Sequence, residues 1–92
     1  MTENELKTVV IRTARNRGWL VYHVTQQKHH NGGDPGYPDL TLAREGHAPM
    51  WIELKQEKGK LTDEQAEWRK LLDTIVIRPS DVTSGYLGEL LK

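Results

Sequence analysis

The sequence contains no cysteine, so neither disulfide bonds nor thiolate zinc ligands can stabilise its fold. It also lacks any apolar run close to the roughly 20 residues that a membrane span requires. The first five residues carry two acidic side chains and no basic one, whereas a secretory signal peptide begins with positive charge. These absences predict a soluble intracellular protein that does not associate with membranes.

Net charge is also missing, because thirteen Lys and Arg residues balance thirteen Asp and Glu residues. The chain therefore lacks the positive excess that is typical of nucleic-acid-binding proteins. Residues 1–33 are an exception, with five basic side chains against Glu3 and Glu5 only. The five are Lys7, Arg12, Arg15, Arg17 and Lys28. They allow a local basic surface, although a solvated helix face is the simpler interpretation.

A length of 92 residues predicts one domain, residues 1–92, with a single core. Apolar residues at helical spacing predict a first helix over residues 2–17, and Thr2 and Glu5 have the spacing of a capping box. Residues 19–25 are rich in β-branched and aromatic side chains, which favours a strand. Residues 26–38 are polar and rich in glycine, and a loop of this length is often functional.

The second half of the chain predicts two strands, over residues 39–44 and 49–55, joined by a turn at Gly46. Thr62 and Gln65 open a second helix with capping-box spacing. A short strand over residues 74–78 and a last helix over residues 81–91 follow. We therefore expect an α/β fold, with a mixed sheet of about four strands flanked by helices.

A hairpin centred on Gly46 pairs residues whose numbers add up to 92, so that Asp39 lies opposite Glu53. Side chains alternate along a strand, which divides the hairpin into two faces. One face is apolar and contains Leu40, Leu42, Met50, Ile52 and Leu54. The other contains Asp39, Thr41, Trp51, Glu53 and Lys55. The hydrophobic pattern thus supports this register independently of any motif.

Directly opposed residues have Cβ atoms about 4.5 to 5.5 Å apart, so the carboxylates of Asp39 and Glu53 would repel each other. A divalent cation such as Mg²⁺, which prefers oxygen ligands, would offset this repulsion. Lys55 adds a positive group on the same face. Two carboxylates, a lysine and a metal ion together suit the hydrolysis of a phosphodiester, which needs an activated water and compensation of negative charge.

Three segments of the chain resemble one nuclease family: residues 36–40 (Gly-Tyr-Pro-Asp-Leu), residues 51–55 (Trp-Ile-Glu-Leu-Lys) and residues 59–65. They resemble the VRR-NUC branch of the PD-(D/E)XK nuclease superfamily, especially its compact phage and viral stand-alone members. The resemblance extends from Glu3 to about Asp81. It implies a restriction-endonuclease-like core and a DNA endonuclease dependent on Mg²⁺ or Mn²⁺. A phage origin would place the protein in the cytoplasm of the host cell.

The resemblance also implies roles for individual residues. Asp39 and Glu53 would bind the metal ion together with the main-chain carbonyl of Leu54, and Lys55 would position the attacking water or stabilise the transition state. Two further catalytic residues are implied, Gln65 in the second helix and Glu3 in the first. Helical spacing points Gln65 inward, although a capping box alone would explain this residue. Glu5 is the alternative to Glu3.

Other candidate residues have simpler explanations. His29 and His30 are adjacent, so they point in different directions, and a solvated loop is expected rather than a metal site. His23 is expected to be half-buried and hydrogen-bonded. The tryptophans at positions 19, 51 and 68 can stack on bases, but a place in the core is the more common one.

The resembled stand-alone nucleases act on branched DNA, which favours a resolvase of four-way (Holliday) junctions. Resolving a four-way junction needs two cuts, and each chain has one site, so we predict a two-fold homodimer. Apolar residues near the C-terminus, Tyr86, Leu87, Leu90 and Leu91, are its candidate interface. The alternatives are a nickase or flap-type nuclease, a non-catalytic DNA-binding module of the same fold, and a hydrolase of small phosphate esters. The intact set of Asp39, Glu53 and Lys55 argues against the non-catalytic module.

Overall fold

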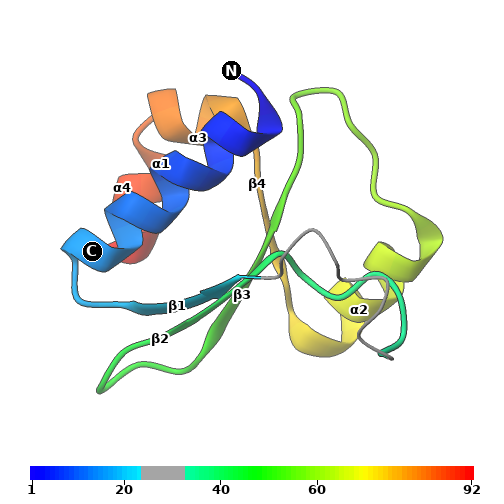
Figure 1. Ribbon diagram of the computed structural model, residues 1–92, viewed down its shortest axis with the longest axis horizontal. Helices are drawn as coiled ribbons and strands as arrows, with labels where there is room; N and C mark the ends of the chain where they lie inside the picture. Colours follow the sequence, from blue (N-terminus) through cyan, green and yellow to red (C-terminus); the bar gives the residue numbers. More distant parts are fainter. Residues whose placement is uncertain (24–32) are drawn as a thin grey trace.

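The computed structural model describes residues 1–23 and 33–92 of the chain (Figure 1). Its four strands form one mixed sheet in the order β1-β2-β3-β4, antiparallel except for the parallel pair β3 and β4. The elements in chain order are α1 (Glu3–Asn16), β1 (Leu20–His23), β2 (Leu40–Ala43), β3 (Met50–Leu54), α2 (Asp63–Leu72), β4 (Ile75–Ile77), α3 (Pro79–Thr83) and α4 (Tyr86–Leu91). The expected α/β fold with a mixed sheet is confirmed.

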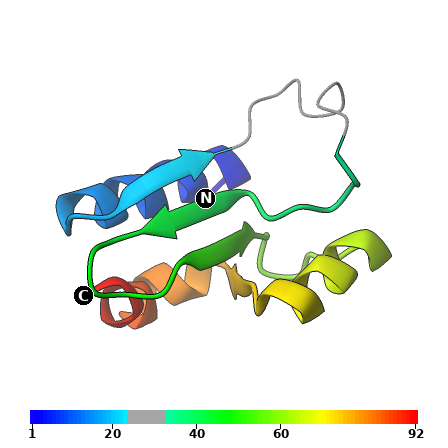
Figure 2. The ribbon, with the colours of Figure 1, turned by 90° about the horizontal axis from the view of Figure 1, so that it is seen from below.

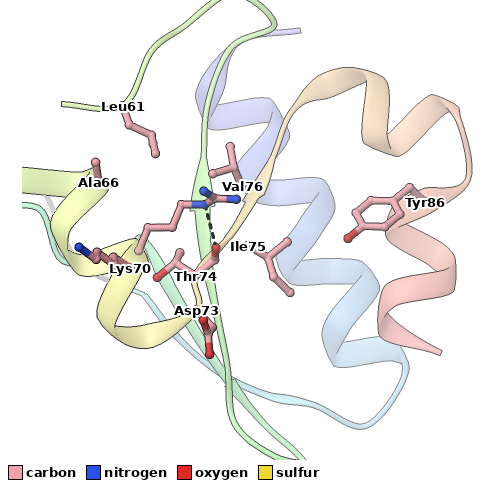
Figure 3. A pocket seen from close by; sticks show the side chains of 9 residues that line it. Leu61, Ala66, Lys70, Asp73, Thr74, Ile75, Val76 and Tyr86 are labelled. Carbon is pink, nitrogen blue, oxygen red and sulfur yellow. Dashed lines mark hydrogen bonds between the residues drawn. The ribbon is translucent and has the colours of Figure 1, made fainter. Parts of the chain in front are cut away.

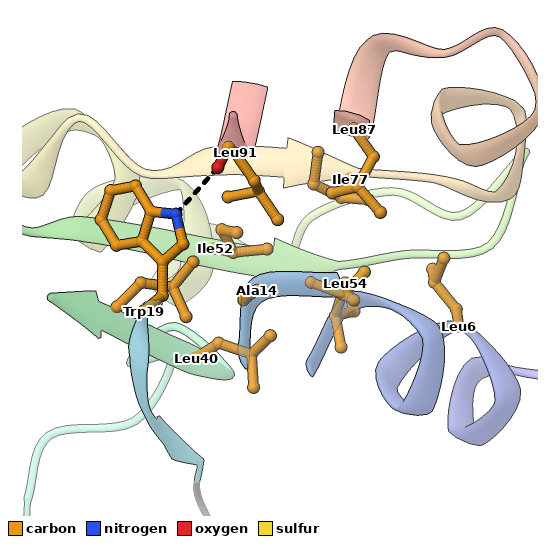
Figure 4. Close-up of a cluster of buried hydrophobic side chains, with 11 residues drawn as sticks. Leu6, Ala14, Trp19, Leu40, Ile52, Leu54, Ile77, Leu87 and Leu91 are labelled. Atoms are coloured by element: carbon orange, nitrogen blue, oxygen red, sulfur yellow. Dashed lines mark hydrogen bonds between the residues drawn. The ribbon is translucent and has the colours of Figure 1, made fainter. Parts of the chain in front are cut away.

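The core lies between one face of the sheet and helices α1 and α4 (Figure 4). Helix α1 buries Leu6, Val10 and Ala14, which are spaced four residues apart and so form one stripe along the helix. Burying a leucine or valine side chain stabilises a fold by about 1.5 to 3 kcal/mol, so this stripe is what holds α1 on the sheet. The helix begins with the predicted capping box of Thr2 and Glu5.

The hairpin of β2 and β3 has the predicted register. Leu40 pairs with Ile52, Thr41 with Trp51 and Leu42 with Met50. Leu40, Leu42 and Ile52 are fully buried in the core. The opposite side of the sheet, called the outer face below, therefore carries Thr41, Trp51 and Glu53. Figures 1 and 2 show α2 apart from the other three helices, next to the start of β2 and the end of β3.

The C-terminal segment departs from the prediction of one helix over residues 81–91. It forms two short helices, because Gly85 takes a positive φ of 88° that ends α3. Pro79 starts α3, where its missing N–H costs nothing, as well as ending the preceding strand. Leu87 and Leu91 are only 3% and 0% exposed, so their predicted place in a dimer interface is wrong, whereas Tyr86 is exposed.

The carbonyl groups at the end of α4 are capped by side chains from distant parts of the chain. The indole Nε1 of Trp19 donates to the Leu91 carbonyl at 3.0 Å (Figure 4). Arg44 donates to the Lys92 carbonyl at 2.9 Å. Arg17 donates to the Gly88 carbonyl. Cationic donors at a helix C-terminus satisfy unpaired carbonyls and complement the helix dipole. This network fixes α4 against the sheet.

Two predictions fall wholly or partly outside the described residues. His29 and His30 lie there, as does most of the predicted loop, of which residues 33–38 are described and contain neither helix nor strand. The predicted strand over residues 19–25 is described as far as His23. No helix in the described part of the chain is long and apolar enough to span a membrane.

Candidate active site

Asp39 lies where the pairing of β2 with β3 ends. The last pair is Leu40 with Ile52, so in the same register Asp39 falls beside Glu53. Beyond this pair the N–H of Leu54 donates to Oδ2 of Asp39 at 2.8 Å. An ionised acceptor makes such a bond stronger than one between neutral groups. The carboxylate of Asp39 is therefore held against the end of β3.

The main-chain carbonyl of Leu54 faces the same side as Asp39. The next residue, Lys55, donates its N–H to the Ile77 carbonyl of β4 at 3.1 Å. Peptide groups alternate in direction along a strand, so the N–H and the carbonyl of Leu54 both point away from β4. The register and this alternation thus place two carboxylates and one main-chain carbonyl, all of them potential oxygen ligands, at the same end of the hairpin.

Glu53 is a buried carboxylate, with 4% of its surface exposed. The side-chain amide of Gln65 donates from Nε2 to Oε2 of Glu53 at 3.1 Å. A buried charge without hydrogen bonds is costly, so this donor stabilises Glu53 in place. The same amide caps α2, because its Oε1 accepts from the N–H of Thr62 at 3.0 Å. Both interpretations of Gln65, the inward-facing residue and the capping residue, describe the same side chain.

Lys55 is partly buried and precedes a turn over residues 56–59. A Cβ on Gly59 would lie 3.6 Å from Cδ of Lys55, so the lysine stem runs along this turn. Arg78 holds the turn, since its Nη1 donates to the carbonyls of Gln56, Glu57 and Gly59. Sequence reasoning missed Arg78, because nothing in its neighbourhood marks it and its partners lie about twenty residues earlier.

The N-terminal glutamates have different surroundings. Glu5 accepts from the N–H of Thr2 at 2.6 Å, and this hydrogen bond lowers the pKa of Glu5 below its ordinary value of 4.5. Capping therefore accounts for Glu5. Glu3 is exposed. In the orientation of the Gln56 amide that gives both its oxygen and its nitrogen a partner, the oxygen accepts from the N–H of Glu3 at 2.8 Å. The start of α1 is thus close to the turn after Lys55, and the catalytic role of Glu3 stays a prediction.

Aromatic side chains border the site on the outer face. The indole Nε1 of Trp51 donates to the hydroxyl of Tyr37 at 3.1 Å. The ring of Tyr37 meets that of Trp68 edge-on, with centroids 5.0 Å apart. The predicted core position holds for Trp19, but Trp51 and Trp68 are only half-buried.

The predicted hydrogen bond of His23 is not found, since its buried Nδ1 has no partner among the described residues.

A cavity of about 680 Å³ lies on the side of α2 that faces β4 (Figure 3). It is lined by Leu61, Ala66, Arg69, Lys70, Asp73, Thr74, Ile75, Val76 and Tyr86. None of the three predicted catalytic residues, all of which are described, lines it. This cavity is therefore separate from Asp39, Glu53 and Lys55.

Paired carboxylates and a lysine at the end of a hairpin, on a mixed α/β sheet, define a nuclease-type domain. The chain belongs to the VRR-NUC family, since the model of the VRR-NUC domain matches residues 2–82. Among solved structures, one named "VRR_NUC domain protein" has the same fold, with a TM-score of 0.70 and 23% sequence identity over 97% of this chain and 87% of that chain. A comparison with curated proteins finds no match. The family resemblance expected from the motifs is confirmed.

Proposed function

We propose that this protein is a DNA endonuclease dependent on Mg²⁺ or Mn²⁺, with Asp39, Glu53 and Lys55 as its catalytic residues. One observation supports this most strongly: the register of the hairpin places Asp39 opposite Glu53, and each carboxylate accepts a hydrogen bond from a different donor. Those donors are the N–H of Leu54 and the amide of Gln65. Membership of a nuclease-type family supports the same reaction class.

The donor set suits a hard divalent cation. Asp39, Glu53 and the carbonyl of Leu54 offer oxygen atoms, which Mg²⁺ prefers to nitrogen or sulfur. In the described residues no three His, Cys, Asp or Glu side chains cluster as metal ligands, so water and phosphate oxygens would complete the coordination. Mg²⁺ commonly keeps several such ligands. When bound, the ion supplies Lewis acidity for the phosphodiester.

The remaining work falls to this chain's own side chains. Gln65 keeps the carboxylate of Glu53 oriented, and the N–H of Leu54 does the same for Asp39. Lys55 projects from the end of β3 and places an ammonium group next to the reacting phosphate. There it orients the attacking water and offsets the negative charge that grows as the P–O bond breaks.

We further propose that the substrate is branched DNA and that the preferred branch is a four-way junction. The site lies at the ends of the two central strands, β2 and β3, and outside the cavity beside α2, as expected for a substrate too large for that cavity. A nickase or a flap-type nuclease is the alternative, because one site per chain is compatible with each of these DNA shapes.

The test uses labelled linear, nicked, flap and four-way DNA, each with Mg²⁺, Mn²⁺ or excess EDTA. We expect metal-dependent cleavage of the four-way junction, and at least a hundredfold less with Asp39→Ala or Glu53→Ala. Glu45→Ala, in the exposed turn of the hairpin, is the matched control and should cut normally. Full cleavage in EDTA, or by either site variant, would contradict the mechanism. Binding without cleavage under all conditions would identify a non-catalytic module.

A further inference from the structure

The segment that leads into Asp39 packs directly on the backbone of α2. Gly36 has a positive φ of 92°, and a Cβ built on it would lie 2.5 Å from the carbonyl carbon of Glu64 and 2.8 Å from the nitrogen of Gln65. Real Cβ atoms do not approach backbone atoms this closely. Only glycine therefore fits between this segment and the peptide that precedes Gln65.

Two aromatic hydrogen bonds hold the same segment on both sides. Trp68, one turn after Gln65 in α2, donates from Nε1 to the Pro35 carbonyl at 2.9 Å. Trp51, two residues before Glu53 in β3, donates to the hydroxyl of Tyr37 at 3.1 Å. The segment over residues 35–38 is therefore fastened to α2 and to the outer face of the sheet, immediately before Asp39.

These contacts matter because the hydrophobic core does not fix α2. None of the side chains of α2, all within the described part of the chain, is buried, and Leu71 is 73% exposed. A helix without a buried face gains little from the core, so its position depends on specific contacts with its neighbours. The contacts of its first two turns include those with Gly36, Pro35, Tyr37 and Glu53.

We propose that Gly36 is a positioning residue of the nuclease site. Gly36 allows the segment before Asp39 to touch the peptide before Gln65. This contact fixes the position of Asp39 relative to the hydrogen-bonded pair of Gln65 and Glu53. A side chain at position 36 would push α2 away, and Gln65 would move with it. Displacements of about 1 Å at a catalytic centre lower rates roughly a hundredfold. The proposal rests on the proposed nuclease function, but its structural consequence is measurable without cleavage.

The test compares Gly36→Ala with Gly46→Ala and Gly85→Ala. All three glycines have positive φ, so each substitution introduces similar backbone strain, but a Cβ at Gly46 or Gly85 would meet no described atom within 4 Å. We expect only Gly36→Ala to lower kcat, by roughly a hundredfold. We also expect it to raise the Mn²⁺ concentration for half-maximal cleavage, with little change in KM for DNA.

Hydrogen exchange provides the readout that does not require activity. The Leu54 amide is protected by Asp39, so it should exchange roughly tenfold faster in Gly36→Ala, the factor that one lost hydrogen bond represents. In Gly46→Ala it should exchange as in the wild type. Equal Leu54 exchange and equal kcat in these two variants would overturn the proposal. If the wild-type protein cuts no DNA but Gly36→Ala still speeds exchange at Leu54, the proposed function is rejected and the positioning role of Gly36 is retained.

A second variant covers the case in which Gly36→Ala does not fold. Trp68→Phe keeps a ring against Tyr37 but removes the hydrogen bond to the Pro35 carbonyl. It should retain the fold, with a smaller loss of kcat and faster exchange at Leu54. Wild-type kcat and wild-type Leu54 exchange in Trp68→Phe would show that the segment does not position the site.

Discussion

The amide of Gln65 performs two tasks that a single carboxylate cannot. Its oxygen accepts from the N–H of Thr62, and its nitrogen donates to Glu53. A glutamate at this position would still cap the helix, but it would place a second carboxylate against Glu53. An amide is therefore the side chain that satisfies both partners.

Gln65→Glu should accordingly destabilise the protein at pH 7.5, by about 1 to 3 kcal/mol, because the buried carboxylate of Glu53 loses the hydrogen bond from Gln65 and faces a second carboxylate. Two neighbouring carboxylates favour uptake of a shared proton, so the deficit should shrink as the pH falls toward 5. Thermal unfolding at both pH values measures this. Gln65→Ala is the control: it removes the donor without adding a second carboxylate, so its deficit should recover less as the pH falls. A pH-independent deficit in Gln65→Glu would contradict the proposed contact.

Lys55→Met separates the ammonium group from the lysine stem that runs along Gly59. The metal ligands are unchanged, so binding of Mn²⁺, measured by calorimetry, should persist. Single-turnover cleavage at saturating Mn²⁺ should fall by about 10²- to 10³-fold, the range for losing one group that stabilises the transition state. Lys58→Met, on the exposed turn, should cut normally. Lost metal affinity together with normal turnover at saturation would make Lys55 a structural residue.

Elements whose signals are local were predictable from the sequence. The capping boxes at Thr2 and Thr62 and the hairpin around Gly46 depend on residues within a few positions of one another, and all three are confirmed. The register then placed Asp39 beside Glu53. By contrast, the contact of Gly36 with Gln65 and the bonds of Arg78 to residues 56–59 join segments that are more than fifteen residues apart. No local pattern contains that information.

The capping box of α1 gives this element a pH-dependent stability. The pKa of Glu5 is lowered by its hydrogen bonds with Thr2, so Glu5 contributes to stability when ionised. A carboxylate with a lowered folded pKa contributes fully above its ordinary value, 4.5, and the contribution is lost as the pH falls through the folded pKa. Thr2 and Glu5 therefore stabilise α1 least in acid.

Glu5→Gln should lower the melting temperature at pH 7, and the difference from the wild type should narrow as the pH falls below about 4.5, the ordinary pKa of this carboxyl. Melting curves by circular dichroism between pH 3 and pH 7 record this. Glu45→Gln, an exposed residue of the hairpin turn without a capping role, is the control and should follow the wild type throughout. A difference that grows in acid would assign Glu5 another role.

At the scale of the whole molecule, Lys7, Arg12 and Arg15 belong to a helix that packs on the core face of the sheet, and Lys28 lies outside the described residues. Helix α1 buries Leu6, Val10 and Ala14 against the core face of the sheet, whereas Glu53 lies on the outer face. Arg17 and Arg44 donate to carbonyls at the end of α4. The chain has no net positive charge, and Arg17 and Arg44 are engaged at α4, so a second subunit would add cations for holding a large polyanion.

The last prediction is that the working unit is a two-fold symmetric homodimer. Resolving a four-way junction requires two cuts related by the two-fold axis of the DNA, and each chain supplies one set of Asp39, Glu53 and Lys55. Sedimentation at micromolar concentration should show twice the chain mass of 10.6 kDa. Mixed dimers with one Glu53→Ala subunit should nick junctions without resolving them, whereas wild-type dimers make both cuts. A monomer that makes paired cuts in one binding event would exclude the dimer, and single cuts by a monomer would favour the nickase.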